Sequence, residues 1–184
     1  MAARTVLQQA DIGRALTRIA HEVLESNHGG HDLIVLGIPT RGVPLAERIG
    51  RILDEIEPGS GIVGTLDITM YRDDLGRNLT RTPTPTHVPP GGIDDKVVIL
   101  VDDVLQSGRT VRAALDALSD IGRPRAVRLA VLIDRGHRAL PIRPDFVGKN
   151  LPSALTERIN VRLTEIDGVE SVTISSPEAH GSES

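Results

Sequence analysis

Residues 97–110 decide the fold of this chain and read Val97-Val98-Ile99-Leu100-Val101-Asp102-Asp103-Val104-Leu105-Gln106-Ser107-Gly108-Arg109-Thr110. The five aliphatic residues at the start predict a strand that is buried on both faces. Two carboxylates follow where such a strand leaves its sheet, and a small polar loop comes next. The helix after the loop is predicted to present one apolar face formed by Val111, Ala114, Leu115 and Leu118. This order of strand, acidic pair, loop and helix is typical of the ligand-binding edge of an open α/β sheet.

The chemistry of this stretch suits a phosphorylated ligand. The loop places backbone N–H groups and hydroxyls at a helix N-terminus, where an anion binds favourably. The carboxylates of Asp102 and Asp103 repel phosphate, so they are expected to hold sugar hydroxyls, a metal ion, or both. A buried strand followed by a merely solvated turn is the alternative without function.

A second unit of the same kind precedes it in the chain. Residues 33–38 form a buried aliphatic strand, and Thr40, Arg41 and Gly42 follow in the turn. A helix with Leu45, Ala46, Ile49 and Ile52 on one face comes next. Since parallel strands end at the same edge of a sheet, both turns are expected to grip one ligand that carries two separate phosphate groups.

The remaining apolar patterns complete an α/β domain. Residues 11–25 are predicted to form a helix capped by Asp11, whose buried face comprises Ile12, Ala15, Leu16, Ile19, Ala20, Val23 and Leu24. Further strands are predicted over residues 61–70, 126–133, 159–166 and 169–174. Residues 134–150 are predicted to form a basic loop.

Length and composition narrow the class of protein. The 184 residues suit one domain, predicted over 1–175, with a disordered tail over 176–184. The irregular polar segment 71–94 is either an idle loop or a lid that keeps water from an activated substrate. Without cysteine, neither disulfides nor thiolate chemistry are possible. Because no apolar run is long enough to span a membrane, we expect a cytoplasmic protein without a membrane partner.

Charge alone does not predict nucleic-acid binding. The net charge is −4, which gives no general attraction for a polyanion. Nineteen of the 21 basic residues are arginine, which suits bidentate phosphate recognition but is also what codon bias in a GC-rich genome produces.

The acidic pair followed by Ser107-Gly108-Arg109-Thr110 resembles the phosphoribosyl pyrophosphate (PRPP) signature of the type I phosphoribosyltransferases. The resemblance implies an α/β fold with a central parallel sheet flanked by helices, a small β hood and a long flexible loop. It also implies magnesium, bound with PRPP by Asp102 and Asp103. Catalytic roles are expected for Asp102, Asp103 and Arg41. PRPP or nucleotide contacts are expected from Thr40, Arg41, Gly42, Arg72, Arg81, Asp102, Asp103, Val104, Leu105, Gln106, Ser107, Gly108, Arg109 and Thr110.

Three further runs narrow this resemblance. Residues 14–22, 67–75 and 134–150, together with the central stretch, resemble the PyrR family of pyrimidine-operon regulators that are also uracil phosphoribosyltransferases. The sequence departs from that family at Gln106, where relatives carry tyrosine, and in the lid. Because purine-using relatives place an aspartate where Gln106 stands, the departure points away from purines and leaves the acceptor of the base's proton open.

The PyrR resemblance implies two kinds of partner. PRPP, uracil and the nucleotides UMP and UTP are the expected small molecules, with the base held near Asp134, Arg135, Ile159 and Val161. The leader mRNA of a pyrimidine operon is the expected macromolecule, bound by a homodimer or a dimer of dimers. The residues expected to bind it are Arg14, Thr17, Arg18, His21, His137, Arg138, Arg143 and Lys149.

Two alternatives stay open beside this interpretation. One is a purely metabolic uracil phosphoribosyltransferase in which the basic surface is only solvated or makes subunit contacts. The other is a regulator that has lost catalysis, which Gln106 slightly favours.

Overall fold

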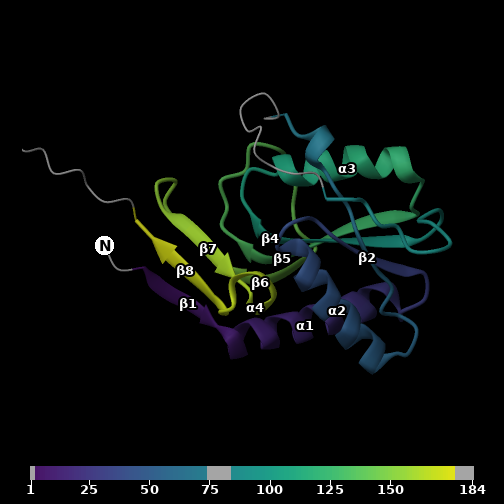
Figure 1. Ribbon diagram of the computed structural model, residues 1–184, viewed down its shortest axis with the longest axis horizontal. Helices are drawn as coiled ribbons and strands as arrows, with labels where there is room; N and C mark the ends of the chain where they lie inside the picture. The colour runs from purple at the N-terminus through teal and green to yellow at the C-terminus, as the bar shows by residue number, and fades with distance from the viewer. Residues whose placement is uncertain (1–2, 74–83, 177–184) are drawn as a thin grey trace, which may run out of the picture.

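The computed structural model describes residues 3–73 and 84–176 and contains two sheets (Figure 1). The central sheet is parallel and has the strand order β3-β2-β4-β5-β6. Its strands are β2 (Leu33–Gly37), β3 (Val63–Thr65), β4 (Val97–Leu105), β5 (Ala126–Asp134) and β6 (Phe146–Asn150). The second sheet is antiparallel, with the order β1-β8-β7. The predicted class, a type I phosphoribosyltransferase fold with a small β hood, matches this architecture.

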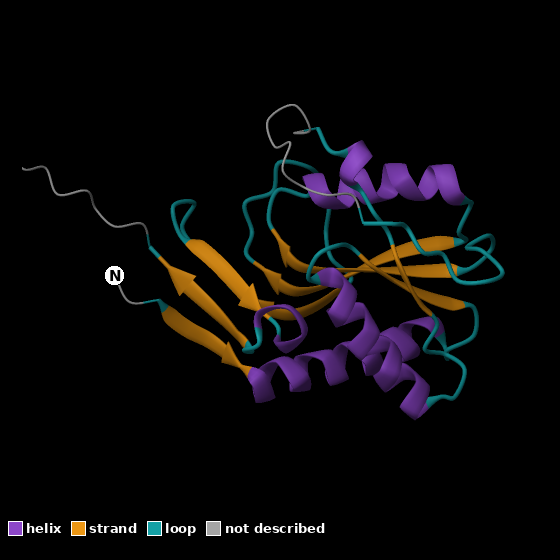
Figure 2. Cartoon of the chain, viewed as in Figure 1, coloured by secondary structure: helices purple, strands orange, loops and turns teal. Residues whose placement is uncertain are grey.

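Strand β4 lies at the centre of the parallel sheet and separates two apolar cores. Val97, Ile99 and Val101 pack into one core, whereas Val98 and Leu100 pack into the other. Alternate side chains of a strand point to opposite faces, so a continuous aliphatic run is what a doubly covered strand requires. Helices α1 (Gln9–Asn27) and α2 (Gly42–Ile56) cover one face, and α3 (Arg109–Ile121) covers the other (Figure 2).

Helix α1 buries the seven side chains that its sequence periodicity predicts. The helix begins two residues earlier than predicted, with Gln8 as its N-cap. Asp11 therefore lies in the first turn, where its carboxylate accepts a hydrogen bond from the backbone N–H of Gln8 at 2.9 Å. The Gln8 side chain in turn accepts from the backbone N–H of Asp11, so the two residues form a capping box. Asp11 thus fixes the helix start from the third position and is not the cap itself.

The hood is formed by β1 (Arg4–Gln8), β7 (Arg158–Arg162), β8 (Ser171–Ser175) and the short helix α4 (Thr164–Asp167). It joins the main body because Leu7, Val161 and Val172 pack into the same core as α1 and α2. Strand β1 was not predicted, since only one of its five side chains is buried and no alternating pattern results.

Several predicted elements differ in extent or type. The predicted strand 61–70 is reduced to β3 and a 3₁₀ turn at Thr69–Tyr71, and the predicted loop 134–150 ends in strand β6. The predicted strand 159–166 stops at Arg162 and continues as α4. On α3, Leu115 is 39% exposed instead of buried, and Ala113 and Ala117 line the apolar face.

Two predictions fall partly on residues that are not described. The lid prediction covers 71–94, of which 74–83 lie outside the described residues, as does nearly all of the predicted tail. The described part of the 71–94 segment returns to the sheet, because the backbones of Thr65 and His87 exchange two hydrogen bonds of 2.8–2.9 Å. Within the described residues, no helix is long and apolar enough to cross a membrane.

The core around α1 gives a prediction on stability. Replacing Leu16, which is 2% exposed, by alanine should lower the free energy of unfolding by about 2–5 kcal/mol, because a cavity remains in the core. The matched change Leu155→Ala, at a residue that is 71% exposed, should change it by less than about 0.5 kcal/mol. Equilibrium urea unfolding of both variants measures this. Equal losses would contradict the assignment of Leu16 to the core.

Candidate functional site

A small polar cavity of about 130 Å³ lies where β2 and β4 end. The turn after β2 and the carboxyl end of β4 both line it, as their positions in a parallel sheet predict. We call it the central cavity, and its lining residues are Pro39, Thr40, Arg41, Arg72, Asp102, Asp103, Val104 and Thr110. The turn after β2 and the acidic pair therefore share one cavity, and Thr110 is the residue of the stretch 106–110 that lines it.

Two glycines let the turn after β2 lie directly against β4. A Cβ atom on Gly42 would lie 2.3 Å from the carbonyl oxygen of Val101 and 3.4 Å from the Cα atom of Asp102. A Cβ atom on Gly37 would lie 2.6 Å from the carbonyl oxygen of Gly42. The N–H of Ile38 also donates a hydrogen bond to the Val101 carbonyl at 2.9 Å. The backbone of this turn is thus fixed beside the carboxylate pair.

The acidic pair lies within β4 and not beyond its end, which corrects the sequence prediction. The strand continues to Leu105, and Asp102 stands opposite Val131 of β5 in the ladder. Asp102 is 8% exposed, and its Oδ1 atom accepts a hydrogen bond from the N–H of Asp103 at 2.9 Å. The ladder between β4 and β5 therefore holds Asp102 at the cavity wall, with Asp103 next to it in the strand.

The loop 106–108 and the start of α3 form the second turn for which anion binding was predicted. Gly108 has a φ angle of 91° and caps α3, so the helix dipole is directed at the loop. The carbonyl oxygen of Ser107 accepts hydrogen bonds from the N–H groups of Ala139 and Leu140 at 2.9 and 3.0 Å. The segment 134–150 thus holds the loop 106–108 in place through these two hydrogen bonds. Leu105, expected beside the ligand, has its side chain buried in the apolar core.

The arginines expected around the site have different partners. Arg41 lines the central cavity and forms an ion pair with Asp167 of α4, with 2.8 Å between Nη2 and Oδ1. Arg72 also lines the cavity. Arg109 is exposed and forms an ion pair with Asp73, and it does not line the central cavity. Arg81 lies outside the described residues.

The residues expected to hold the base lie at the end of β5 and in the hood. Burial raises the pKa of Asp134, but the Arg138 guanidinium and the N–H of Gly136 outweigh it and bring that pKa below its usual range. Arg135 is buried and donates two hydrogen bonds of 2.9 Å to the carbonyls of Ala154 and Glu157. Val161 packs in the core and Ile159 lies against it. The contacts described for these four residues are all with other parts of the protein, and their assignment to the base stays a prediction.

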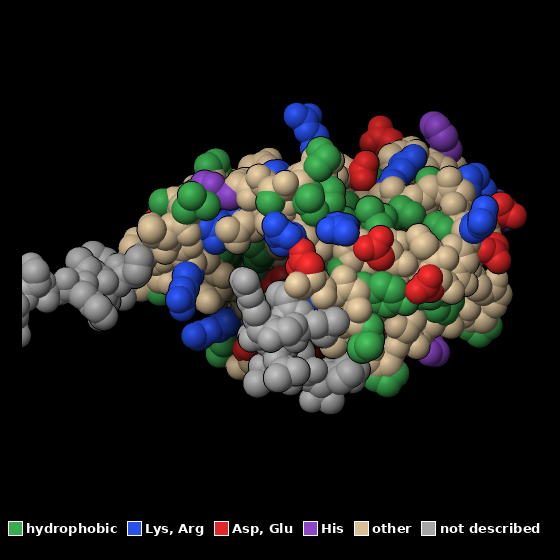
Figure 3. All heavy atoms as spheres, turned by 90° about the horizontal axis from the view of Figure 1, so that it is seen from above, with side chains coloured by type: hydrophobic (Ala, Val, Ile, Leu, Met, Phe, Trp, Pro, Cys, Tyr) green, Lys and Arg blue, Asp and Glu red, His purple; other side chains and the backbone are tan. Residues whose placement is uncertain are grey.

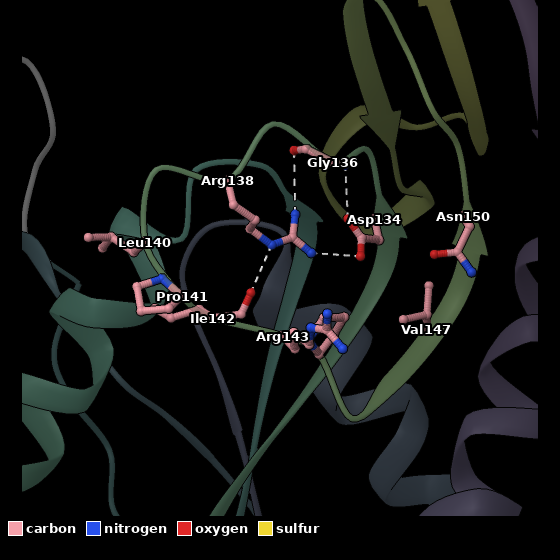
Figure 4. Close-up of a pocket in the computed structure, with 10 residues that line it drawn as sticks. Asp134, Gly136, Arg138, Leu140, Pro141, Ile142, Arg143, Val147 and Asn150 are labelled. Carbon is pink, nitrogen blue, oxygen red and sulfur yellow. Dashed lines mark hydrogen bonds and ion pairs between the residues drawn. The ribbon is translucent and has the colours of Figure 1, made fainter.

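A larger open groove of about 640 Å³ lies beside this region (Figure 4). Arg138 crosses it and is fixed by Asp134 at 2.7 Å, by the Ile142 carbonyl at 2.9 Å and by the Gln106 carbonyl at 3.1 Å. We call it the basic groove, and its lining comprises Asp134, Gly136, Arg138, Leu140, Pro141, Ile142, Arg143, Pro144, Val147 and Asn150. Its apolar floor and immobilised guanidinium provide a surface on which a planar ring can stack.

A second cluster of basic side chains lies on the other side of β6. Arg18 of α1 donates hydrogen bonds to the carbonyls of Val147 and Gly148 at 3.1 and 2.6 Å, which joins α1 to the strand. A hollow of about 330 Å³ there is lined by Leu7, Asp11, Arg14, Ala15, Arg18, Gly148 and Lys149. The structure thus gathers Arg14, Arg18, Arg138, Arg143 and Lys149 around one strand.

The other residues expected to bind RNA are placed less directly. His21 is exposed on α1, and the Thr17 hydroxyl donates a hydrogen bond to the carbonyl of Gly13 at 3.0 Å. His137 contacts the carbonyl of Ser153 through its ring nitrogen.

Sequence reasoning missed the acidic residues of the hood. Asp167 contacts Arg41 at the N-cap of α2, and Glu165 and Glu170 contact Arg48 within α2. In each pair the arginine precedes its partner by more than a hundred residues. No local pattern signals such pairs, because they depend on how the hood folds back over α2.

The sequence of the chain is similar to a known family of proteins. The sequence profile of the phosphoribosyl transferase domain matches residues 3–163. "Bifunctional protein PyrR" of Leifsonia xyli subsp. xyli is 68% identical over 179 residues, which cover 95% of this chain and 97% of the relative. The protein of the same name from Streptomyces coelicolor is 58% identical and covers 97% and 94%.

Solved structures agree on the fold. The hypoxanthine phosphoribosyltransferase of Trypanosoma cruzi superposes with a TM-score of 0.68 at 14% identity, covering 96% of this chain and 98% of the other. A hypoxanthine phosphoribosyltransferase of Staphylococcus aureus gives 0.68 at 16% identity, covering 97% and 94%. At such identities the likeness concerns the arrangement of the chain and not its substrate.

The glycine contact gives a prediction that concerns the site. Gly42→Ala should displace the turn from β4 and lower the free energy of unfolding by about 1–3 kcal/mol, because the added methyl group overlaps a backbone oxygen. Gly13→Ala is the matched control, since a Cβ atom on Gly13 of α1 meets nothing within 4 Å. It should leave stability unchanged or raise it by about 0.4–1 kcal/mol. Urea unfolding compares the two, and an unaffected Gly42→Ala variant would disprove the close contact.

Proposed function

The chain belongs to the phosphoribosyltransferase family, among the bifunctional PyrR proteins, and we propose that it converts uracil and PRPP to UMP and pyrophosphate and binds pyrimidine-operon mRNA in response to uridine nucleotides. One observation carries the enzymatic half of this proposal. The central cavity combines a carboxylate pair with the cationic turn after β2 and with Thr110 at the start of α3. PRPP is a sugar with a phosphate at one end and a pyrophosphate at the other.

Each part of PRPP has a partner of matching chemistry in the site. The 5′-phosphate binds at the loop 106–108 and the N-terminus of α3, where hydroxyls and the helix dipole favour an anion. The ribose hydroxyls donate hydrogen bonds to Asp102 and Asp103. The pyrophosphate binds at the turn 40–42, with Arg41 and Arg72 supplying positive charge.

The donor set also fits magnesium that arrives with PRPP. Among the residues that the structure describes, no cluster of three or more His, Asp or Glu side chains could hold a metal by itself. Two carboxylates and the oxygens of a bound phosphate are a usual set for Mg²⁺, and Asp102 and Asp103 provide the protein's share. When bound, the ion supplies positive charge that offsets the charge of the pyrophosphate.

The reaction is a substitution at C1 of the ribose. The bond from C1 to the pyrophosphate oxygen breaks, a bond from the ring nitrogen N1 of uracil to C1 forms, and the proton of N1 is released. Positive charge develops on the ribose next to Asp102 and Asp103, and negative charge develops on the pyrophosphate next to Arg41. Preorganised charges of opposite sign on both sides of the breaking bond lower the barrier without a covalent intermediate.

The carboxylate pair is the first target for a test. Asp102→Asn should lower kcat/KM at least about a hundredfold, because it removes charge facing the developing cation. Asp116→Asn on α3, where the side chain is 56% exposed, should leave it unchanged. Formation of UMP from uracil and PRPP is measured, with hypoxanthine and orotate as control bases. Full activity of Asp102→Asn would exclude the proposed role.

The regulatory half of the proposal concerns the residues around β6. We propose that Arg14, Thr17, Arg18, His21, His137, Arg138, Arg143 and Lys149 contact RNA, and that unstacked bases lie on the basic groove. Acidic and basic side chains are interspersed over the face that Figure 3 shows. With a net charge of −4, the chain has no general long-range attraction for RNA. A single small basic region gives modest affinity, and pairing two copies of the chain would raise it.

RNA binding is tested by reversing one charge in the groove. Arg143 is exposed, and Arg143→Glu should weaken binding of a pyrimidine-operon leader RNA about tenfold or more and flatten its salt dependence. Arg123→Glu changes an equally exposed arginine outside the groove and should have little effect. Gel shifts with and without UMP, at several salt concentrations, measure both. If the two variants bound the RNA equally well, the proposal that RNA binds at the basic groove would be refuted.

The same two assays separate the alternatives. Turnover without RNA binding would identify a purely metabolic uracil phosphoribosyltransferase. UMP-dependent RNA binding without turnover would identify a regulator that has lost catalysis.

A further inference from the structure

We propose that Asp167 of the hood is a positioning residue that holds the guanidinium of Arg41 at the pyrophosphate end of the central cavity. The inference rests on the proposed phosphoribosyl transfer and adds a residue to it. Asp167 contacts Arg41 and not the reacting atoms, so its effect on PRPP would pass through the arginine.

The contact between the two side chains is well defined. Nη2 of Arg41 donates to Oδ1 of Asp167 at 2.8 Å, and the side chains are 32% and 20% exposed. The other carboxylate oxygen of Asp167 accepts a hydrogen bond from the N–H of Leu163 at 2.9 Å. The Leu163 N–H and the Arg41 guanidinium keep the pKa of Asp167 below its usual range. Because Leu163 is fully buried, the carboxylate is anchored to the core on one side and to Arg41 on the other.

A second arginine also holds the hood. Arg41 is the N-cap of α2, and Arg48 lies about two helical turns further along that helix. It contacts Glu165 at 2.7 and 2.8 Å and Glu170 at 2.6 and 3.0 Å. Glu170 is only 5% exposed in this cluster. Arg48 therefore holds the hood through one residue before Asp167 and one residue after it.

Arg41 keeps N–H groups that Asp167 does not use. Its Nε atom is buried and has no hydrogen-bond partner among the described residues, and an unpaired buried donor is costly. Because Arg41 lines the central cavity, a ligand with oxygen atoms there would offer acceptors to this side chain. With Nη2 fixed by Asp167, the remaining N–H groups keep a constant orientation toward such a ligand. Holding a long side chain in advance removes the entropy cost of ordering it on binding.

The test compares Asp167→Asn with Glu165→Gln. Both changes remove one carboxylate charge from α4 and weaken one arginine contact, but only Asp167 touches Arg41. Asp167→Asn should raise the KM for PRPP and the inhibition constant of pyrophosphate about tenfold, with the KM for uracil within about twofold. Glu165→Gln should leave all three unchanged, because Glu170 still holds Arg48. Thermal unfolding of both variants shows whether any loss reflects the fold.

A double-mutant cycle with Arg41→Ala separates positioning from general damage. In the Arg41→Ala background, Asp167→Asn should cause no further loss of PRPP binding, measured by calorimetry with magnesium, because the side chain that it positions is gone. Additive losses, an unchanged or lower KM for PRPP in Asp167→Asn, or an equal effect of Glu165→Gln would overturn the inference. A wild-type protein that binds PRPP without forming UMP would instead refute the proposed transfer, and the binding cycle would still decide the role of Asp167.

Discussion

The site depends on the direct backbone contact between the turn after β2 and strand β4. At Gly42 these two backbone segments lie so close together that a single methyl group would overlap the carbonyl oxygen of Val101. This contact fixes the distance between the carboxylates of β4 and the cationic turn that ends in Arg41. Any ligand that bridges the two must match that spacing, so a feature of backbone packing selects the length of the sugar phosphate that fits.

The sequence predicts the layers of the fold because each layer has a local signature. An aliphatic run without alternation identifies β4, and a 3.6-residue period identifies the buried face of α1. Elements with few buried side chains could not be predicted in this way. Strands β1 and β6 and helix α4 owe their conformation to partners that are distant in sequence, which single-sequence periodicity does not report.

The candidate site follows the same division. The acidic pair and the turn 40–42 are contiguous motifs, and the sequence predicts that they meet because both strands end at one edge of the sheet. Asp167 and Asp73 pair with Arg41 and Arg109, and these two ion pairs emerge only from the three-dimensional structure. The assignment of the base to Asp134 and Arg135 stays a prediction, since their described contacts serve local structure.

The hydrogen bonds of Arg18 have a consequence for association between copies of the chain. Strand β6 is one border of the central sheet, and Arg18 of α1 donates hydrogen bonds to the carbonyls of Val147 and Gly148 in that strand. At the opposite border, His87 pairs with Thr65 of β3. Both border strands of the central sheet therefore already make hydrogen bonds to other parts of the same chain. Such contacts oppose the addition of a strand from a neighbouring molecule, which is a route to aggregation.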